Sequence, residues 1–105
     1  MKVQHALMLT AGLMLAAPVL ADDGAALLKK NNCVTCHQPV KKTVGPGLKM
    51  IADKYAGDAG AAAKLEAKVR KGGAGSFGTM PMPPAQAKVS DADIKTMVAH
   101  ILASK

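Results

Sequence analysis

The stretch Cys33-Val34-Thr35-Cys36-His37 is the part of the sequence that decides the fold. Two cysteines separated by two residues and followed directly by a histidine form the attachment pattern of c-type haem. Each thiol can add to one of the two vinyl groups of a haem, and the adjacent imidazole can then bind the iron. The motif therefore predicts one covalently attached haem c, held by Cys33 and Cys36, with His37 as an axial iron ligand.

Three other uses of the two cysteines fit the chain less well. A thioredoxin-like dithiol would need a βαβ framework, and the sequence has no convincing strand. A disulfide between residues this close would close a very small loop and stabilise little. A zinc site could add His37 or His100 to the thiols, but these histidines lack the spacing of a zinc finger.

The composition also favours a bound prosthetic group. The chain has 105 residues, with one Tyr, one Phe and no Trp, and its length allows one small domain. A short chain with so few bulky side chains buries too little apolar surface for a stable core of its own. A large flat apolar cofactor would complete that core. No nucleophile–base pair is recognisable, so the sequence predicts an electron-transfer protein and not an enzyme.

The first 21 residues have the pattern of a secretory signal peptide. Lys2 gives a positive start, residues 6–17 are the most apolar part, and Val19 and Ala21 supply the small side chains that signal peptidase requires at positions −3 and −1. The apolar stretch is short for a membrane span of about 20 residues, which disfavours an uncleaved anchor. We expect cleavage after Ala21, a mature domain at residues 22–105, and export to a bacterial periplasm.

The mature chain has a helical hydrophobic pattern, which predicts an all-α fold of about four short helices around the haem. We expect helices at residues 24–31, capped by Asp22 and Asp23, at 49–56 and at 61–71. A last helix should begin at Ser90, where Ser90-Asp91-Ala92-Asp93 resembles a capping box.

The last helix carries one apolar stripe, formed by Ile94, Met97, Val98, Ile101 and Leu102. His100 lies about 240° around the helix from the start of this stripe, so we expect it to be a solvated surface residue. Met50 and Met97 fall at apolar helical positions, and we expect both to pack in the core.

Met82 is the best candidate for the second axial ligand. It lies in Pro81-Met82-Pro83-Pro84, and the prolines stiffen the backbone around the thioether. A thioether ligand favours ferrous iron and raises the reduction potential. Met80 is the local alternative, without a proline on both sides, and a plain packing role for Met82 is the other alternative.

These motifs together resemble the short-chain bacterial monohaem class I cytochromes c. The resemblance rests on the Cys-x-x-Cys-His motif, on Val44-Gly45-Pro46, on the Met82 segment and on the closing helix. It implies thioethers at Cys33 and Cys36 and axial ligation by His37 and Met82.

The resemblance also assigns roles to residues around the haem. The Pro46 carbonyl would accept a hydrogen bond from the His37 ring, which fixes the ring and makes it a stronger donor. Phe77 resembles the aromatic residue near a haem propionate, where relatives often have Trp. Ala85 stands where relatives often have Asn near the Met sulfur.

The implied function is that of a soluble periplasmic electron carrier, which donates electrons to a nitrite reductase or a terminal oxidase and receives them from a quinol-oxidising complex. A haem enzyme or gas sensor with a labile Met82 bond, and an electron-entry subunit of a larger dehydrogenase, remain as alternatives. We expect a monomer with no membrane anchor.

The chain is strongly basic, with a formal net charge of +7 from 14 Lys+Arg and 7 Asp+Glu. Loss of residues 1–21 would remove one lysine and no acid, leaving +6. The lysines either solvate the surface or form a rim around an exposed haem edge that attracts an acidic redox partner. Nucleic acid is not an expected partner, because the chain has an export signal and no aromatic platforms.

Overall fold

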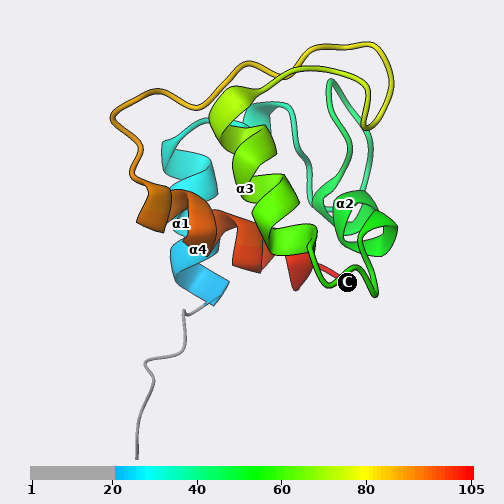
Figure 1. Cartoon of the computed structure of the whole chain (residues 1–105), viewed down its shortest axis with the longest axis horizontal. Helices are drawn as coiled ribbons and strands as arrows, with labels where there is room; N and C mark the ends of the chain where they lie inside the picture. Colours follow the sequence, from blue (N-terminus) through cyan, green and yellow to red (C-terminus); the bar gives the residue numbers. More distant parts are fainter. Residues whose placement is uncertain (1–20) are drawn as a thin grey trace, which may run out of the picture.

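The computed structural model describes residues 21–105, so the predicted signal peptide lies outside the described residues except for Ala21. The described part contains four α-helices and one short 3-10 helix (Figure 1), namely α1 (Ala21–Lys30), η1 (Cys33–Thr35), α2 (Leu48–Lys54), α3 (Ala61–Lys71) and α4 (Asp91–Leu102). Within these residues there is no β-strand, only two isolated bridges. The predicted all-α fold is confirmed.

The ends of the helices follow local sequence signals. α3 has the predicted bounds and stops at Gly72, and the Ser90 hydroxyl accepts a hydrogen bond from the Asp93 N–H (3.0 Å) just before α4. α1 begins earlier than predicted, so Asp22 and Asp23 lie in its first turn and not in front of it. Acidic residues are favoured in that turn as well, because the helix dipole is positive there.

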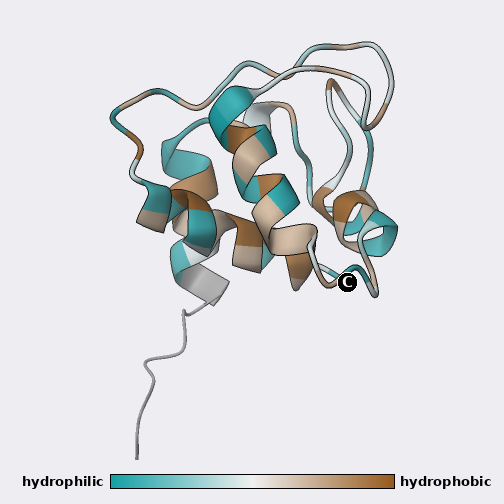
Figure 2. Cartoon of the chain, viewed as in Figure 1, coloured by the Kyte–Doolittle hydropathy of each residue, from teal (hydrophilic) through white to brown (hydrophobic). Residues whose placement is uncertain are grey.

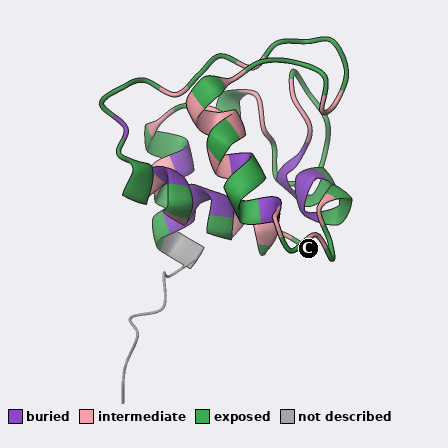
Figure 3. Cartoon of the chain, in the orientation of Figure 1, coloured by how far each residue is buried: buried purple, intermediate pink, exposed green. Residues whose placement is uncertain are grey.

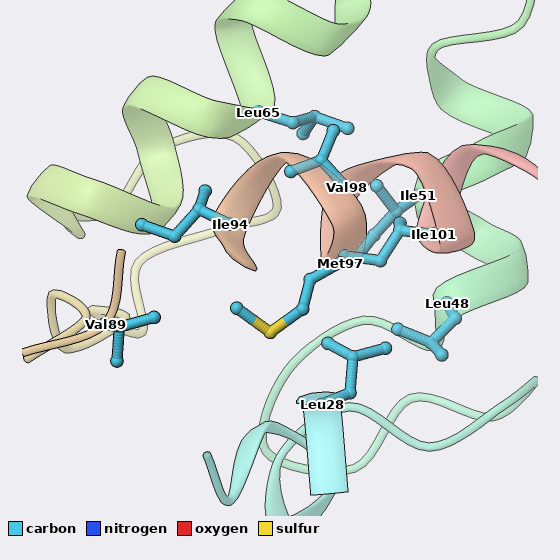
Figure 4. Packing of buried hydrophobic residues seen from close by; sticks show 9 residues of the cluster. All are labelled: Leu28, Leu48, Ile51, Leu65, Val89, Ile94, Met97, Val98 and Ile101. Carbon is cyan, nitrogen blue, oxygen red and sulfur yellow. The ribbon is translucent and has the colours of Figure 1, made fainter. Parts of the chain in front are cut away.

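Helix α4 is the centre of the fold, because α1, α2 and α3 all pack against it. Its buried side chains are Ile94, Met97, Val98 and Ile101, four of the five residues of the predicted apolar stripe. The fifth, Leu102, is half-buried. Figure 4 shows how the other elements meet this face, with Leu28 from α1, Leu48 and Ile51 from α2, Leu65 from α3, and Val89 just before α4.

The long segment between α3 and α4 crosses the outside of the helices (Figure 1). The apolar residues, brown in Figure 2, lie mainly in the helices, and Figure 3 shows the connecting segment as exposed or half-buried over most of its length. None of residues 72–88 is buried. Side-chain burial therefore does little to hold this segment. Among residues 21–105, no helix has both the length and the apolar character needed to cross a membrane.

The prediction that His100 is a solvated surface residue is wrong. His100 is half-buried against α1, where a Cβ atom added to the buried Gly24 would collide with the His100 Cβ. The His100 Nδ1 is buried and has no hydrogen-bond partner among the described residues. Three helices pack against α4, so the buried part of its circumference is wider than the apolar stripe and includes part of His100.

The prediction that Met50 packs in the core is also wrong, whereas Met97 is only 2% exposed, as expected. Met50 is 36% exposed, because the short helix α2 directs Leu48, Ile51 and Ala52 to the core and leaves Met50 at the edge of that face. Its sulfur lies 3.4 Å from the Gly47 N–H, just before the helix.

Candidate functional site

The Cys-x-x-Cys-His motif forms one tight turn directly after α1. The Cys33 carbonyl accepts hydrogen bonds from the Cys36 N–H (3.2 Å) and the His37 N–H (2.9 Å). Asn32, in a left-handed conformation with φ 60°, ends the connection from α1. The turn leaves the two thiols and the imidazole half-buried, with the thiols and the ring beside neighbouring cavities.

Both cysteines are free and half-buried. Burial raises the pKa of the Cys33 thiol, and the charge of Cys36 adds to this, against a lowering by a backbone hydrogen bond. Dithiol oxidoreductases depend on the opposite shift, towards a thiolate. In the part of the chain that the structure describes, no three His, Cys, Asp or Glu side chains gather as a metal site.

The His37 ring is fixed by the loop that follows it. Its Nδ1 lies 2.8 Å from the Pro46 carbonyl oxygen, as the resemblance predicts. A carbonyl only accepts, so Nδ1 carries the proton of the neutral imidazole and Nε2 keeps a free lone pair. Gly45 permits this approach, because a Cβ there would lie 2.9 Å from the ring Cε1.

Two cavities lie beside this turn. The larger, of about 440 Å³, is lined by Cys33, Cys36 and Met82, and the smaller, of about 100 Å³, by His37 and Met82. Val69 of α3 also lines both. The larger volume lies in the range of small-molecule and cofactor sites. The structure thus brings together the two thiols, the imidazole and the thioether that the sequence singled out.

Met82 is held at the cavities by backbone pairing with the end of α3. Met82 and Gly73 exchange two N–H to carbonyl hydrogen bonds, both 2.9 Å long. Met82 is half-buried, whereas Met80 is 64% exposed, although Met80 also lines the smaller cavity. The geometry favours Met82 over Met80 as a ligand.

Phe77 lines the smaller cavity and lies below a lysine. The Lys54 ammonium is 4.5 Å from the centroid of the Phe77 ring, and it also donates a hydrogen bond to the Ser76 carbonyl. A cation over an aromatic face is attractive. This cluster holds the Phe77 ring at the cavity without an indole N–H.

Sequence reasoning assigned no role to two parts of the site. In the sequence, Val69 is only an apolar residue one turn after Leu65. No pattern in the neighbouring residues indicates that it lines both cavities. Gly72 and Gly73 read as the end of a helix, although Gly73 pairs with a residue nine positions further on. Both roles depend on how the segment after α3 folds back.

The described domain is all-α and has two cavities that share Met82, one lined by the two free thiols and the other by the imidazole. This arrangement fits covalent attachment of a porphyrin and defines a c-type haem protein. The comparisons with known proteins agree. A family model for cytochrome c matches residues 21–105. Cytochrome c-552 of Nitrosomonas europaea is 48% identical over 93 residues, which are 89% of this chain and 87% of that protein. Cytochrome c-551 of Pseudomonas aeruginosa is 40% identical over 98 residues, covering 93% and 92%.

The solved structures agree on the fold. The crystal structure of wild-type Nitrosomonas europaea cytochrome c552 superposes with a TM-score of 0.71 at 49% identity, covering 77% of this chain and 99% of that one. The chain belongs to the cytochrome c family, and specifically to its small monohaem class I members. It carries one covalently bound haem c and is an electron carrier, not an enzyme.

Proposed function

We propose that this chain shuttles single electrons in the periplasm, after removal of residues 1–21, through a haem held by Cys33 and Cys36 as thioethers and by His37 and Met82 as axial ligands. When bound, the haem supplies a one-electron redox couple. The donor we propose is a quinol-oxidising complex, and the acceptor is a respiratory reductase or oxidase, such as a nitrite reductase or a terminal oxidase.

The observation that carries the proposal is the arrangement of His37. The Pro46 carbonyl holds the proton on Nδ1 and leaves Nε2 free on a half-buried ring at the cavity wall. A hydrogen-bonded imidazole is a stronger and better oriented iron ligand. With Met82 at the same cavity, the chain can fill both axial positions itself, which suits a carrier because little has to move between the two oxidation states.

Replacement of Met82 by alanine tests the axial pair. We expect the Met82→Ala variant to lose the sulfur-to-iron charge-transfer band at the red end of the visible spectrum, because no other thioether is held at the same place. Its reduction potential should fall, since the thioether favours ferrous iron. Met80→Ala is the matched control and should keep both properties. Survival of the band in Met82→Ala, with its loss in Met80→Ala, would move the assignment to Met80.

The cavity walls also suggest how partners approach. Lys30 and Lys88 line the larger cavity, and neither belongs to an ion pair among residues 21–105. Their charges therefore remain available to an acidic partner. The smaller cavity, which shares Val69 and Met82 with the larger one, has exposed apolar side chains, with Met80 at 64% and Val44 at 51% exposure. Charged groups around an apolar patch suit brief electron-transfer encounters.

Attraction of anions by the two lysines at the larger cavity predicts that the rate of reaction with an anionic oxidant depends on the salt concentration. In the reduced protein, Lys30→Ala/Lys88→Ala should lower the rate constant for oxidation by ferricyanide on the order of threefold to tenfold at low ionic strength. The difference should shrink as salt is added. Lys95→Ala/Lys105→Ala removes the same charge from exposed positions that do not line the cavity. Equal effects of the two double variants would show that only net charge matters and would contradict a directed docking surface.

A further inference from the structure

We propose that the end of α3 positions the iron ligand, with Gly72 and Gly73 acting as a backbone clamp on the Met82 segment. This inference rests on the axial role of Met82 proposed above and adds the device that holds the ligand in place. Gly72 lines neither cavity, whereas Gly73 lines the smaller one. Both would act through the position of Met82.

The need for a clamp follows from the exposure of the segment. None of residues 72–88 is buried, and Figure 3 shows most of this connection at the surface. Apolar burial, which fixes the helices, is therefore weak here. A loop of this kind keeps one position only if its backbone is tied down.

Hydrogen bonds tie the segment to α3 on both sides of the ligand. Within Pro81-Met82-Pro83-Pro84, Met82 has the only backbone N–H, and this N–H donates to the Gly73 carbonyl. The Gly73 N–H donates back to the Met82 carbonyl, so the pair is reciprocal. Beyond the prolines, the Ala85 N–H donates to the Val69 carbonyl in the last turns of α3 (2.9 Å).

Gly72 sets how closely the two backbones approach. It has φ 66° and ψ −156°, a region that is essentially limited to glycine. A Cβ atom there would collide with the Met82 carbonyl oxygen and would lie 2.7 Å from the Pro84 nitrogen and 3.0 Å from the Pro83 carbonyl carbon. These are backbone atoms of a proline-stiffened segment, so they cannot turn aside as the end of a flexible side chain can. A side chain at position 72 must therefore displace the segment that carries Met82.

The test compares two glycines that both have a positive φ but have different surroundings. Gly57 has φ 78°, and a Cβ there would meet nothing within 4 Å, so Gly57→Ala measures the cost of a side chain at positive φ without a collision. Gly72→Ala adds the collision with the Met82 segment. Both variants are prepared as holoproteins and compared in the ferric state, well below their unfolding temperatures.

We expect Gly72→Ala to weaken the charge-transfer band and to bind cyanide at least about tenfold faster than Gly57→Ala. A tenfold change corresponds to about 1.4 kcal/mol, which weakening of the two hydrogen bonds between Gly73 and Met82 is enough to supply. Gly57→Ala should lower the thermal unfolding midpoint and leave the band and the cyanide rate at the wild-type values. Equal cyanide rates in the two variants would overturn the clamp.

A second pair of variants covers the case in which Gly72→Ala takes up no haem. Ala85→Pro removes the N–H that bonds Val69 and also fixes φ at this position, and it should speed cyanide binding. Ala87→Pro is its control, because Ala87 follows Gln86 in a turn closed by the Val89 N–H, a place where proline is favoured. A wild-type rate in Ala85→Pro would count against the clamp. If Met82→Ala itself keeps the band, the proposed ligation fails, whereas loss there with no effect at Gly72 refutes the clamp alone.

Discussion

Replacing both Cys33 and Cys36 by serine is expected to give a colourless chain without a cooperative unfolding transition. The buried cluster has only nine side chains and borders a cavity of about 440 Å³. Without a cofactor this space is open to water, so its apolar lining adds nothing to the buried core. A core this small leaves little stability for so short a domain. The chain without its cofactor should therefore be largely unfolded.

Mass spectrometry and thermal circular dichroism check this result. The double variant should have the mass of the processed peptide alone and should lose helical signal gradually on heating. The single variants Cys33→Ser and Cys36→Ser are the graded controls, because each keeps one thiol at the cavity. A sharp transition near the wild-type midpoint in the colourless double variant would show that the four helices fold without haem, which would contradict this expectation.

Gly24→Ala is expected to destabilise the protein by about 1–3 kcal/mol, although the same change inside a helix ordinarily stabilises by about 1 kcal/mol. Gly24 is buried where α1 crosses α4, and a Cβ atom there would collide with the His100 Cβ and lie 3.1 Å from the Thr96 carbonyl oxygen. The two helices would have to move apart, and α4 carries most of the core.

Urea unfolding of a double-mutant cycle separates collision from helix propensity. His100→Gly removes the Cβ atom on the other side of the contact, so Gly24→Ala should cost less than half as much in that background. A stabilising effect of Gly24→Ala in the wild-type background would mean that the crossing accommodates the methyl group. That result would contradict the close contact between the helices.

Local signals predicted most of the fold. The motif at Cys33, the glycine after α3 and the cap at Ser90 each act within one or two turns of chain, and all three lie where the sequence placed them. The hydrogen bond between His37 and Pro46 was also expected, but from the family resemblance and not from the residues alone. Local patterns work here because capping and tight turns depend on neighbours in the sequence.

The errors and omissions depend on contacts between distant segments. His100 and Met50 were misplaced because a helical stripe gives a direction but not the number of helices that surround it. The pairing of Gly73 with Met82 was missed because a glycine pair after a helix reads only as a stop signal. Such contacts form only when distant segments meet in the folded chain, and the hydrophobic periodicity of one helix carries no information about them.

The crossing of α1 and α4 has a consequence for the order in which the molecule matures. The helix beside the cysteines is formed by the first described residues, and the helix that it needs as a support is formed by the last. Contacts between such distant segments form late and slowly. Until these two ends of the domain meet, the cysteines lack the support of α4 and remain accessible for attachment to the porphyrin.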